Sequence, residues 1–159
     1  MNNKFNNMKR LDNILLILSK YDKVKTATKL EKLCYILDEK TDFKFEGDYN
    51  WEWDECGWTS LKFYDDLLFL INLGLVDKKD IGSKNTSDEY AIKNQLPEEE
   101  SLCNSIFFLS NKGEKIVKQL KEENNISDDD LSIPKRYESC NSLNQILEII
   151  YDEYEENKE

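Results

Sequence analysis

The sequence contains no histidine. Histidine is the side chain whose charge changes near neutral pH, and it is a common general base and zinc ligand. Its absence excludes Ser-His and Cys-His nucleophile pairs and every zinc site that needs an imidazole. The glycine-rich phosphate-binding patterns and the GxSxG and HExxH motifs are also missing. We therefore expect no catalytic residue, no metal ligand and no cofactor, and a protein that is not an enzyme.

Proline and glycine are scarce, at 2 and 5 residues, which disfavours a turn-rich all-β fold. Apolar runs reach only five residues, as at 14–18, which is too short to span a bilayer. The first residues are polar and lack the apolar segment of a signal peptide. The four cysteines form no CxxC pair, so we expect reduced thiols. These features predict a cytoplasmic protein without a membrane partner.

Acidic residues outnumber basic ones, with Asp+Glu 33 against Lys+Arg 22 and a net charge of −11. The excess is concentrated after residue 80, where the net charge is −9, against −2 before it. Nucleic-acid binders usually carry a basic footprint, because affinity depends on neutralising phosphates. An acidic surface equally suits a basic protein partner. The charge thus favours a protein partner but leaves DNA as an alternative.

Apolar residues recur at helical spacing in several stretches. They predict a central helix over 8–21, a helix over 61–73 capped by Ser60, a helix capped by Ser110 and a last helix over 143–156. In the third of these we expect Ile116, Val117 and Leu120 to lie inside.

A further helix is expected to begin at Thr28-Lys29-Leu30-Glu31, which fits a capping box. Lys29 and Lys32 are expected on its exposed side. In the helix over 61–73, Leu67 and Leu70 should point inward and Phe69 should widen the buried stripe.

Residues 43–54 alternate apolar and polar side chains, which indicates extended chain with one apolar face. A hairpin turning at Gly47 keeps Phe45 and Tyr49 on one face only with a three-residue loop. The alternatives are that hairpin or one irregular strand. Further strands are expected at 75–76, at 89–93 as a returning strand, and at 106–109.

This order of elements predicts an α+β fold with a winged helix-turn-helix-like core. The first domain would span 8–93, and 94–159 would add a strand and a C-terminal helical extension packed on the same core.

Several stretches resemble a known group, the Panacea-type antitoxin domains and related uncharacterised prokaryotic winged-helix-like proteins. They are Thr28-x-Leu30-x-Lys32-Leu33-x-Tyr35-x-Leu37, Gly57-Trp58-Thr59-Ser60, Leu73-Gly74-Leu75-Val76, Leu109-Ser110-x-Lys112-Gly113 and Leu143-x-x-Ile146-Leu147-x-x-Ile150-Tyr151. The resemblance implies transcription regulation or toxin neutralisation, and it brings no catalytic residue.

A basic cluster over residues 20–32 has a local charge of +3. It makes Lys25, Lys29 and Lys32, together with Lys62, the candidate phosphate contacts. The helix over 61–73 is itself net −1 and has no arginine or glutamine to read bases.

Trp51 and Trp58 are the candidate partner-binding residues, because tryptophan is favoured at interface hot spots. The function expected is a non-enzymatic regulatory binding module, a DNA-binding transcription regulator or an antitoxin. The alternative is an acidic protein-interaction module that has lost DNA binding. A homodimer is compatible with both.

Overall fold

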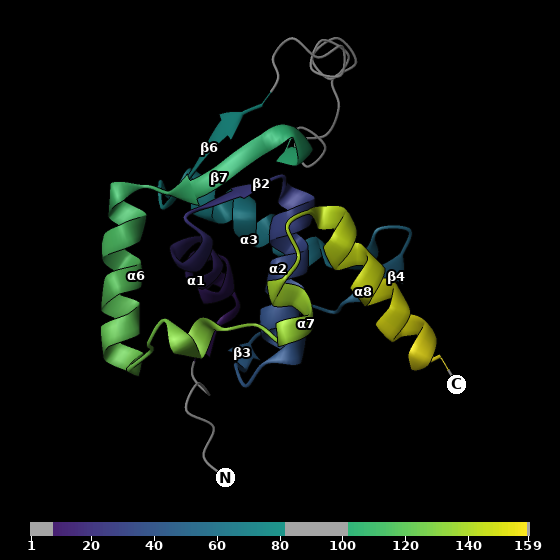
Figure 1. The fold of residues 1–159 in the computed structure, drawn as a ribbon. Helices are drawn as coiled ribbons and strands as arrows, with labels where there is room; N and C mark the ends of the chain where they lie inside the picture. Colours follow the sequence, from purple (N-terminus) through teal and green to yellow (C-terminus); the bar gives the residue numbers. More distant parts are fainter. Residues whose placement is uncertain (1–7, 82–101, 159) are drawn as a thin grey trace, which may run out of the picture.

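The computed structural model describes residues 8–81 and 102–158 (Figure 1). The elements in chain order are β1 (Met8–Lys9), α1 (Arg10–Tyr21), β2 (Lys23–Lys25), α2 (Ala27–Lys40), β3 (Phe45–Glu46), β4 (Glu52–Asp54), β5 (Gly57–Thr59), α3 (Leu61–Asn72), β6 (Val76–Asp80), the 3₁₀ turn η1 (Leu102–Asn104), β7 (Ser105–Leu109), α6 (Asn111–Asn124), the 3₁₀ turn η2 (Asp129–Leu131), α7 (Lys135–Glu138) and α8 (Leu143–Glu156). The expected α+β class is confirmed.

The largest sheet among the described residues has three antiparallel strands in the order β2-β7-β6. Its central strand β7 pairs Phe107 with Val24 on one side and with Lys78 on the other. Phe107 is fully buried. A short apolar run therefore becomes the middle strand, which joins a segment near the N-terminus to one after α3.

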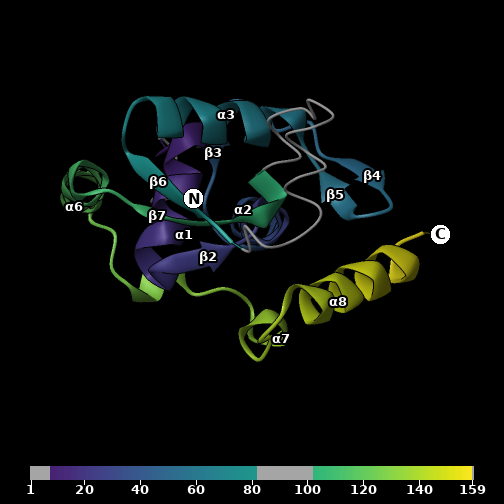
Figure 2. The ribbon, with the colours of Figure 1, turned by 90° about the horizontal axis from the view of Figure 1, so that it is seen from above.

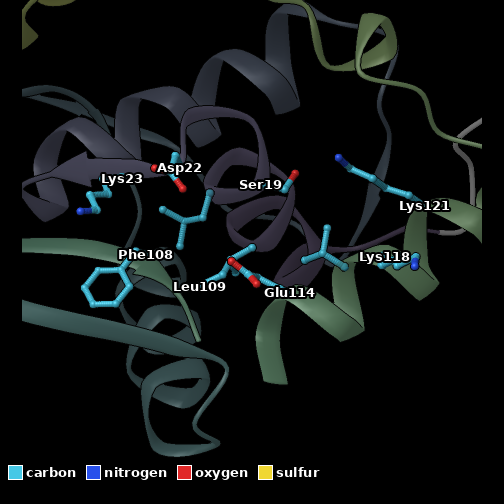
Figure 3. Close-up of a pocket in the computed structure, with 10 residues that line it drawn as sticks. Ser19, Asp22, Lys23, Phe108, Leu109, Glu114, Lys118 and Lys121 are labelled. Carbon is cyan, nitrogen blue, oxygen red and sulfur yellow. The ribbon is translucent and has the colours of Figure 1, made fainter. Parts of the chain in front are cut away.

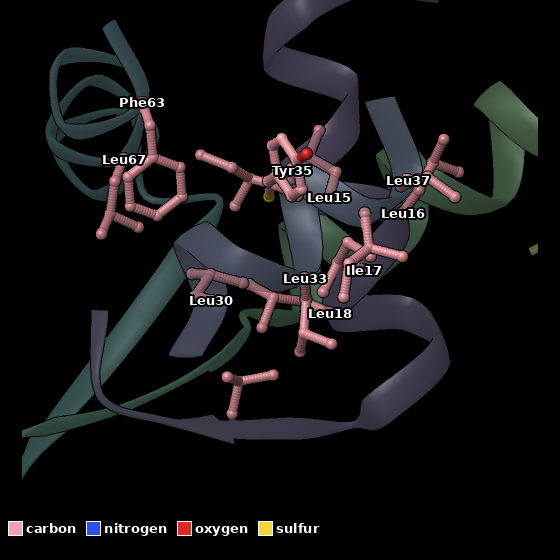
Figure 4. Close-up of a cluster of buried hydrophobic side chains, with 14 of the residues drawn as sticks. Leu15, Leu16, Ile17, Leu18, Leu30, Leu33, Tyr35, Leu37, Phe63 and Leu67 are labelled. Atoms are coloured by element: carbon pink, nitrogen blue, oxygen red, sulfur yellow. The ribbon is translucent and has the colours of Figure 1, made fainter. Parts of the chain in front are cut away.

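Three helices, α1, α2 and α3, pack on one another and contact this sheet (Figure 1). The side chains of α1 from Asn13 to Leu18 are all buried. Figure 4 shows buried side chains of α1 and α2 together with Phe63 and Leu67 of α3 in one cluster. The central position predicted for the first helix is confirmed, because a helix that is apolar on two sides needs cover on both.

The start of α2 differs from the predicted capping box. Thr26 is the N-cap and accepts a hydrogen bond from the Lys29 backbone N–H at 3.2 Å, so Thr28 lies inside the first turn. Pairing with β7 explains the shift, because the Thr26 N–H bonds the Ser105 carbonyl at 2.8 Å and keeps the chain extended up to Thr26.

The helix predicted over 8–21 begins at Arg10, because Met8–Lys9 pair with Phe45–Glu46, whereas the serine caps predicted for two later helices are confirmed. Ser60 accepts from the Phe63 N–H at the start of α3, and Ser110 accepts from the Gly113 N–H at the start of α6. Gly74 follows α3 with a φ of +77°, a backbone conformation that favours glycine.

The hairpin predicted around Gly47 is wrong. The segment Phe45–Glu46 pairs in parallel with Met8–Lys9, and the antiparallel hairpin lies further on, where Trp53 of β4 faces Trp58 of β5. Local turn chemistry does not decide between the two places. The Asp54 carboxylate accepts from the Cys56 N–H at 2.7 Å before Gly57 at a φ of +85°, but Asp48 likewise accepts from the Asn50 N–H at 2.8 Å after Gly47 at a φ of +91°. The difference is tertiary, because Met8–Lys9 pair with Phe45–Glu46.

The strand predicted over 89–93 lies outside the described residues. The strand predicted from 75 is β6, and the one predicted over 106–109 is β7.

Two of the C-terminal helices, α6 and α8, lie at opposite sides of the α1–α2–α3 core (Figure 2). In α6, Gly113 approaches the Leu75 carbonyl so closely that a Cβ would lie 2.1 Å from its oxygen. Ile116 was expected inside but is 39% exposed, because this helix contacts the core along a narrow stripe centred on Val117. The last helix, α8, begins and ends where predicted and buries Ile146 and Ile150.

Within the described ranges, no helix combines the length and the hydropathy that a bilayer crossing requires.

Candidate functional site

The four candidate phosphate contacts lie in different environments. Lys25 is exposed at the end of β2, while Lys29 and Lys62 are half-buried in the first turns of α2 and α3. Lys62 lines a pocket together with Glu31 and other carboxylates. Lys62 therefore adjoins acidic side chains, while only some lysines of the cluster over 20–32 remain exposed.

Lys32 was expected on the exposed side of α2, and that placement is wrong. Its side chain is fully buried, with Nζ 2.8 Å from Glu31 Oε1 and 2.7 Å from the Trp58 carbonyl oxygen. The side of α2 that points away from α1 is covered by β5 and α8, so no phosphate can reach this ammonium. Lys32 holds α2 against the hairpin instead of binding a ligand.

Glu31 completes this buried ion pair. Its second oxygen, Oε2, accepts from the Ser60 N–H at 3.1 Å, at the N-terminus of α3. Burial raises the pKa of Glu31, while Lys32 and the Ser60 N–H act in the opposite direction. The ion pair therefore connects α2 to the start of α3. Glu31 was predicted to cap the helix to which it belongs, but it accepts a hydrogen bond from the N-terminus of the next helix, α3.

Trp51 and Trp58 are both half-buried and both contact other rings. The Trp51 Nε1–H donates to Asp38 Oδ2 at 2.9 Å, and its ring stacks on Tyr49 with centroids 4.6 Å apart. Trp58 is parallel to Tyr35 within 12°, at 6.1 Å. Burial raises the pKa of Asp38 to about 6. These tryptophans are thus held in fixed positions.

Trp53 connects this aromatic cluster to α8. Its ring stacks on Tyr154 at 3.7 Å with an interplanar angle of 5°, and the edge of Tyr151 meets it at 5.3 Å. The Tyr151 hydroxyl also donates to the Glu55 carbonyl oxygen. The C-terminal helix therefore covers the aromatic face of the β4–β5 hairpin.

The outward face of α3 has no such cover in the described structure. Leu61 is 84% exposed, Phe69 is 50% exposed and Leu73, just after the helix, is 44% exposed. Asp65 is exposed between them. Phe69 was expected to widen the buried stripe, which is wrong. The four residues are spaced by four along the chain, so they follow one stripe that a helical projection of the sequence could have revealed.

The second carboxylate of α3 is not available on this face. Asp66 is buried and makes two hydrogen bonds with the Arg10 guanidinium, at 2.6 and 2.8 Å. The exposed stripe of α3 is therefore apolar with one negative charge.

A pocket of about 630 Å³ opens beside the N-terminal end of α3. Leu61, Lys62 and Tyr64 of α3 line it, and the opposite wall carries Glu52 and Asp54 of β4. With Glu31 also in the lining, carboxylates outnumber cations, so the pocket favours a positively charged group.

A second pocket, of about 340 Å³, lies between α1, β7 and α6 (Figure 3). Leu18, Phe108 and Val117 supply apolar surface, while Lys118 and Glu114 are among its charged residues. Its charged lining residues are three lysines and two carboxylates, so the charges nearly balance, with a small excess of positive charge.

Comparisons with protein-family models, with curated proteins and with solved structures find no match for this chain.

Proposed function

We propose that this chain is a non-enzymatic protein-binding module, built on a winged-helix-like scaffold, that holds a basic protein partner against the outward face of α3. The order of elements supports the scaffold. With the short strands β3, β4 and β5 between α2 and α3 taken as an insertion, it is helix, strand, two helices and two strands. The sheet order β2-β7-β6 supports it further, since the strand between the first two helices pairs with the last strand.

The observation that carries the proposal is the composition of the exposed stripe of α3. In a winged helix the corresponding helix reads DNA, with arginine, lysine, asparagine or glutamine at base edges. Here the stripe presents Leu61, Asp65, Phe69 and Leu73. Exposed apolar side chains in one stripe are typical of a protein interface, and Phe69 suits the centre of one.

Charge supports a basic partner. The acidic pocket lies at the Leu61 end of the stripe, so a partner that buries apolar side chains on Phe69 could place a lysine or arginine between Glu52 and Asp54. The net charge of −11 would accelerate encounter with a cationic protein and oppose approach to DNA. An antitoxin-type role, in which the chain neutralises a basic protein, fits this surface.

The test compares two variants that each remove exposed apolar surface. Partners captured from host-cell extract are identified and purified, and their dissociation constants are measured with the wild-type chain, with the double variant Phe69→Ser/Leu73→Ser and with Ile116→Ser. Ile116 is a matched control because it is also a partly exposed apolar side chain, but on α6. We expect a basic partner whose affinity falls about thirtyfold or more in the double variant and is unchanged in the control.

A measurement of DNA binding completes the test. Binding to mixed duplex DNA is measured by fluorescence anisotropy at about 50 and 200 mM salt. We expect no binding at either concentration. Binding that weakens steeply with salt, or a partner that binds the double variant as tightly as the wild type, would contradict the proposal and favour DNA regulation or another interface.

A further inference from the structure

A third pocket, of about 350 Å³, lies on the opposite side of the 49–51 segment from the acidic pocket beside α3. Three aromatic rings line it. Tyr35 comes from α2, Trp51 from the residue just before β4, and Trp58 from β5. The remaining lining residues are Glu39, Asp48 and Asn50. Aromatic side chains and carboxylates thus make up almost all of the lining.

The three rings have two orientations. Tyr35 and Trp58 are stacked within 12° with centroids 6.1 Å apart, whereas Trp51 stands at 89° to Tyr35 with centroids 5.3 Å apart. Because an aromatic ring has a negative face, a cation that enters the pocket is attracted to any ring whose face it meets.

The two tryptophan rings of the pocket are held in place before any ligand binds. Trp51 is held by its hydrogen bond to Asp38 and by the stack on Tyr49. Trp58 is held by the Lys32 ammonium at its carbonyl oxygen and by edge contact with Trp53. A ligand would therefore meet rings that are already ordered, which lowers the entropic cost of binding.

The charged residues in the lining of the pocket are both acidic, while Lys62 Nζ lies 3.1 Å from the side-chain amide of Asn50 at its edge. Glu39 and Asp48 are exposed carboxylates in the lining, and the described lining residues include no lysine or arginine. Asp38 lies behind Trp51, and Lys44 is close enough to lower its pKa by charge. An incoming cation would thus find aromatic faces and carboxylates together.

We propose that the pocket lined by Tyr35, Trp51 and Trp58 binds an alkylammonium cation, best a trimethylammonium group. Methylation removes the N–H donors that hold water around an ammonium, so a methylated cation loses less hydration on entering an aromatic site. The same group occurs in small molecules such as choline and in trimethylated lysine side chains. This site adjoins the acidic pocket at the end of α3, with which it shares Asn50, but none of its three rings belongs to the exposed stripe of α3.

The first experiment separates charge from shape. Choline and its neutral isostere 3,3-dimethyl-1-butanol are each titrated into the full chain, with tryptophan fluorescence and calorimetry as readouts. We expect choline to bind about tenfold more tightly than the isostere, since the cation–π attraction acts on the charge alone. Equal binding of the two, or no choline binding up to about 50 mM, would overturn the proposal.

Two kinds of variant locate the site. Trp58→Leu removes one of the three aromatic rings and should abolish choline binding. Because that change could also disturb folding, Glu39→Gln/Asp48→Asn serves as the second variant, for which we expect affinity about three- to tenfold lower with an unchanged circular dichroism spectrum. Full choline affinity in both variants would place binding elsewhere and contradict the proposal. Phe69→Ser/Leu73→Ser should retain choline binding, whether or not the α3 surface binds a protein.

A peptide arm identifies the source of the cation. Peptides with an unmodified or a trimethylated lysine are compared with choline. Tighter binding of the trimethylated peptide than of choline assigns the pocket to a protein side chain, and equal or weaker binding assigns it to a free small molecule. Tighter binding of the unmodified peptide than of the trimethylated one would contradict the preference for a methylated cation.

Discussion

Two apolar surfaces of this molecule differ in whether another part of the chain covers them. The aromatic face of the β4–β5 hairpin is covered by α8, with Trp53 stacked on Tyr154, whereas the outward stripe of α3 leaves Leu61 and Phe69 exposed. Both surfaces flank the same junction, where Ser60 starts α3 and Glu31 accepts its N–H. Within the described residues, α8 covers the aromatic face of the hairpin, and no helix covers the stripe of α3.

The covered surface contributes to stability, and the open one to binding. Beneath the hairpin the contacts are specific, with a buried ion pair and stacked rings. On α3 the exposed leucines and Phe69 gain less from the fold than core residues do, since between 44% and 84% of the area of each remains in water. Changes in the first region should therefore alter the free energy of unfolding, and changes in the second should alter affinity.

The largest effect should follow loss of the buried ammonium. Lys32→Ala leaves the Glu31 carboxylate buried without its cation, and we expect a loss of about 3–5 kcal/mol in the free energy of unfolding, measured by urea denaturation. Lys29→Ala, on the same helix but half-buried, is the matched control and should stay within about 0.5 kcal/mol. A loss below about 1 kcal/mol for Lys32→Ala would mean that the pair is not the anchor of this junction.

Uncovering the hairpin should have a smaller effect. Trp53→Ala removes the stack on Tyr154 and should cost about 2 kcal/mol, because the ring is only half-buried. A double-mutant cycle with Tyr154→Ala should give a coupling energy of about 1 kcal/mol. Faster proteolytic cleavage in α8 would accompany the change. Additive single effects would show that α8 is not held by this stack.

Asp38 offers a test through pH. Burial raises its pKa to about 6 in the folded chain, above its value in an unfolded one. The folded state therefore binds the proton more tightly, so the stability from this group is complete below about pH 4 and is lost as pH rises through about 6.

Asp38→Asn keeps an oxygen for the Trp51 indole N–H and removes the charge. We expect it to be more stable than the wild type at neutral pH by about 1 kcal/mol, after allowing for solvent screening of a partly exposed group, and equally stable near pH 4. Urea titrations at both pH values measure this. An equal difference at the two pH values would exclude titration of Asp38 as the cause.

The smallest loss of stability per site is expected for the open surface. Phe69→Ser and Leu73→Ser should each lower the free energy of unfolding by about 1 kcal/mol, because each side chain already has about half of its area in water. Thermal and urea denaturation provide the measurement. A loss of about 3 kcal/mol or more at either site would mean that the stripe serves the fold, which would weaken the contrast between the two surfaces.

Much of the fold could be predicted from local pattern. The helix 143–156 was located correctly because its apolar residues recur at helical spacing after a serine cap, and Ser60 and Ser110 signal their helices in the same way. The hairpin could not be located, because alternation over 43–54 fits several turns and the choice depends on the pairing of Phe45–Glu46 with the distant Met8–Lys9.

The candidate site was predicted less well than the fold. Lys32 is charged and lies in a lysine-rich stretch, so nothing local distinguishes it from Lys25 or Lys29. Its burial follows from β5 and α8 covering the same side of α2, and these contacts join residues far apart in the chain. Phe69 was misplaced for the opposite reason, since its hydrophobicity predicts burial but no described element covers it.

The sequence by itself determined the α+β class, the positions of the long helices and the acidic balance, because periodicity, caps and charge are local or additive properties. Only the tertiary structure decided which lysine is buried, which tryptophans face one another and which apolar stripe stays in water. Those outcomes depend on which surfaces meet after folding, and a helix has the same local pattern whether or not another element covers it.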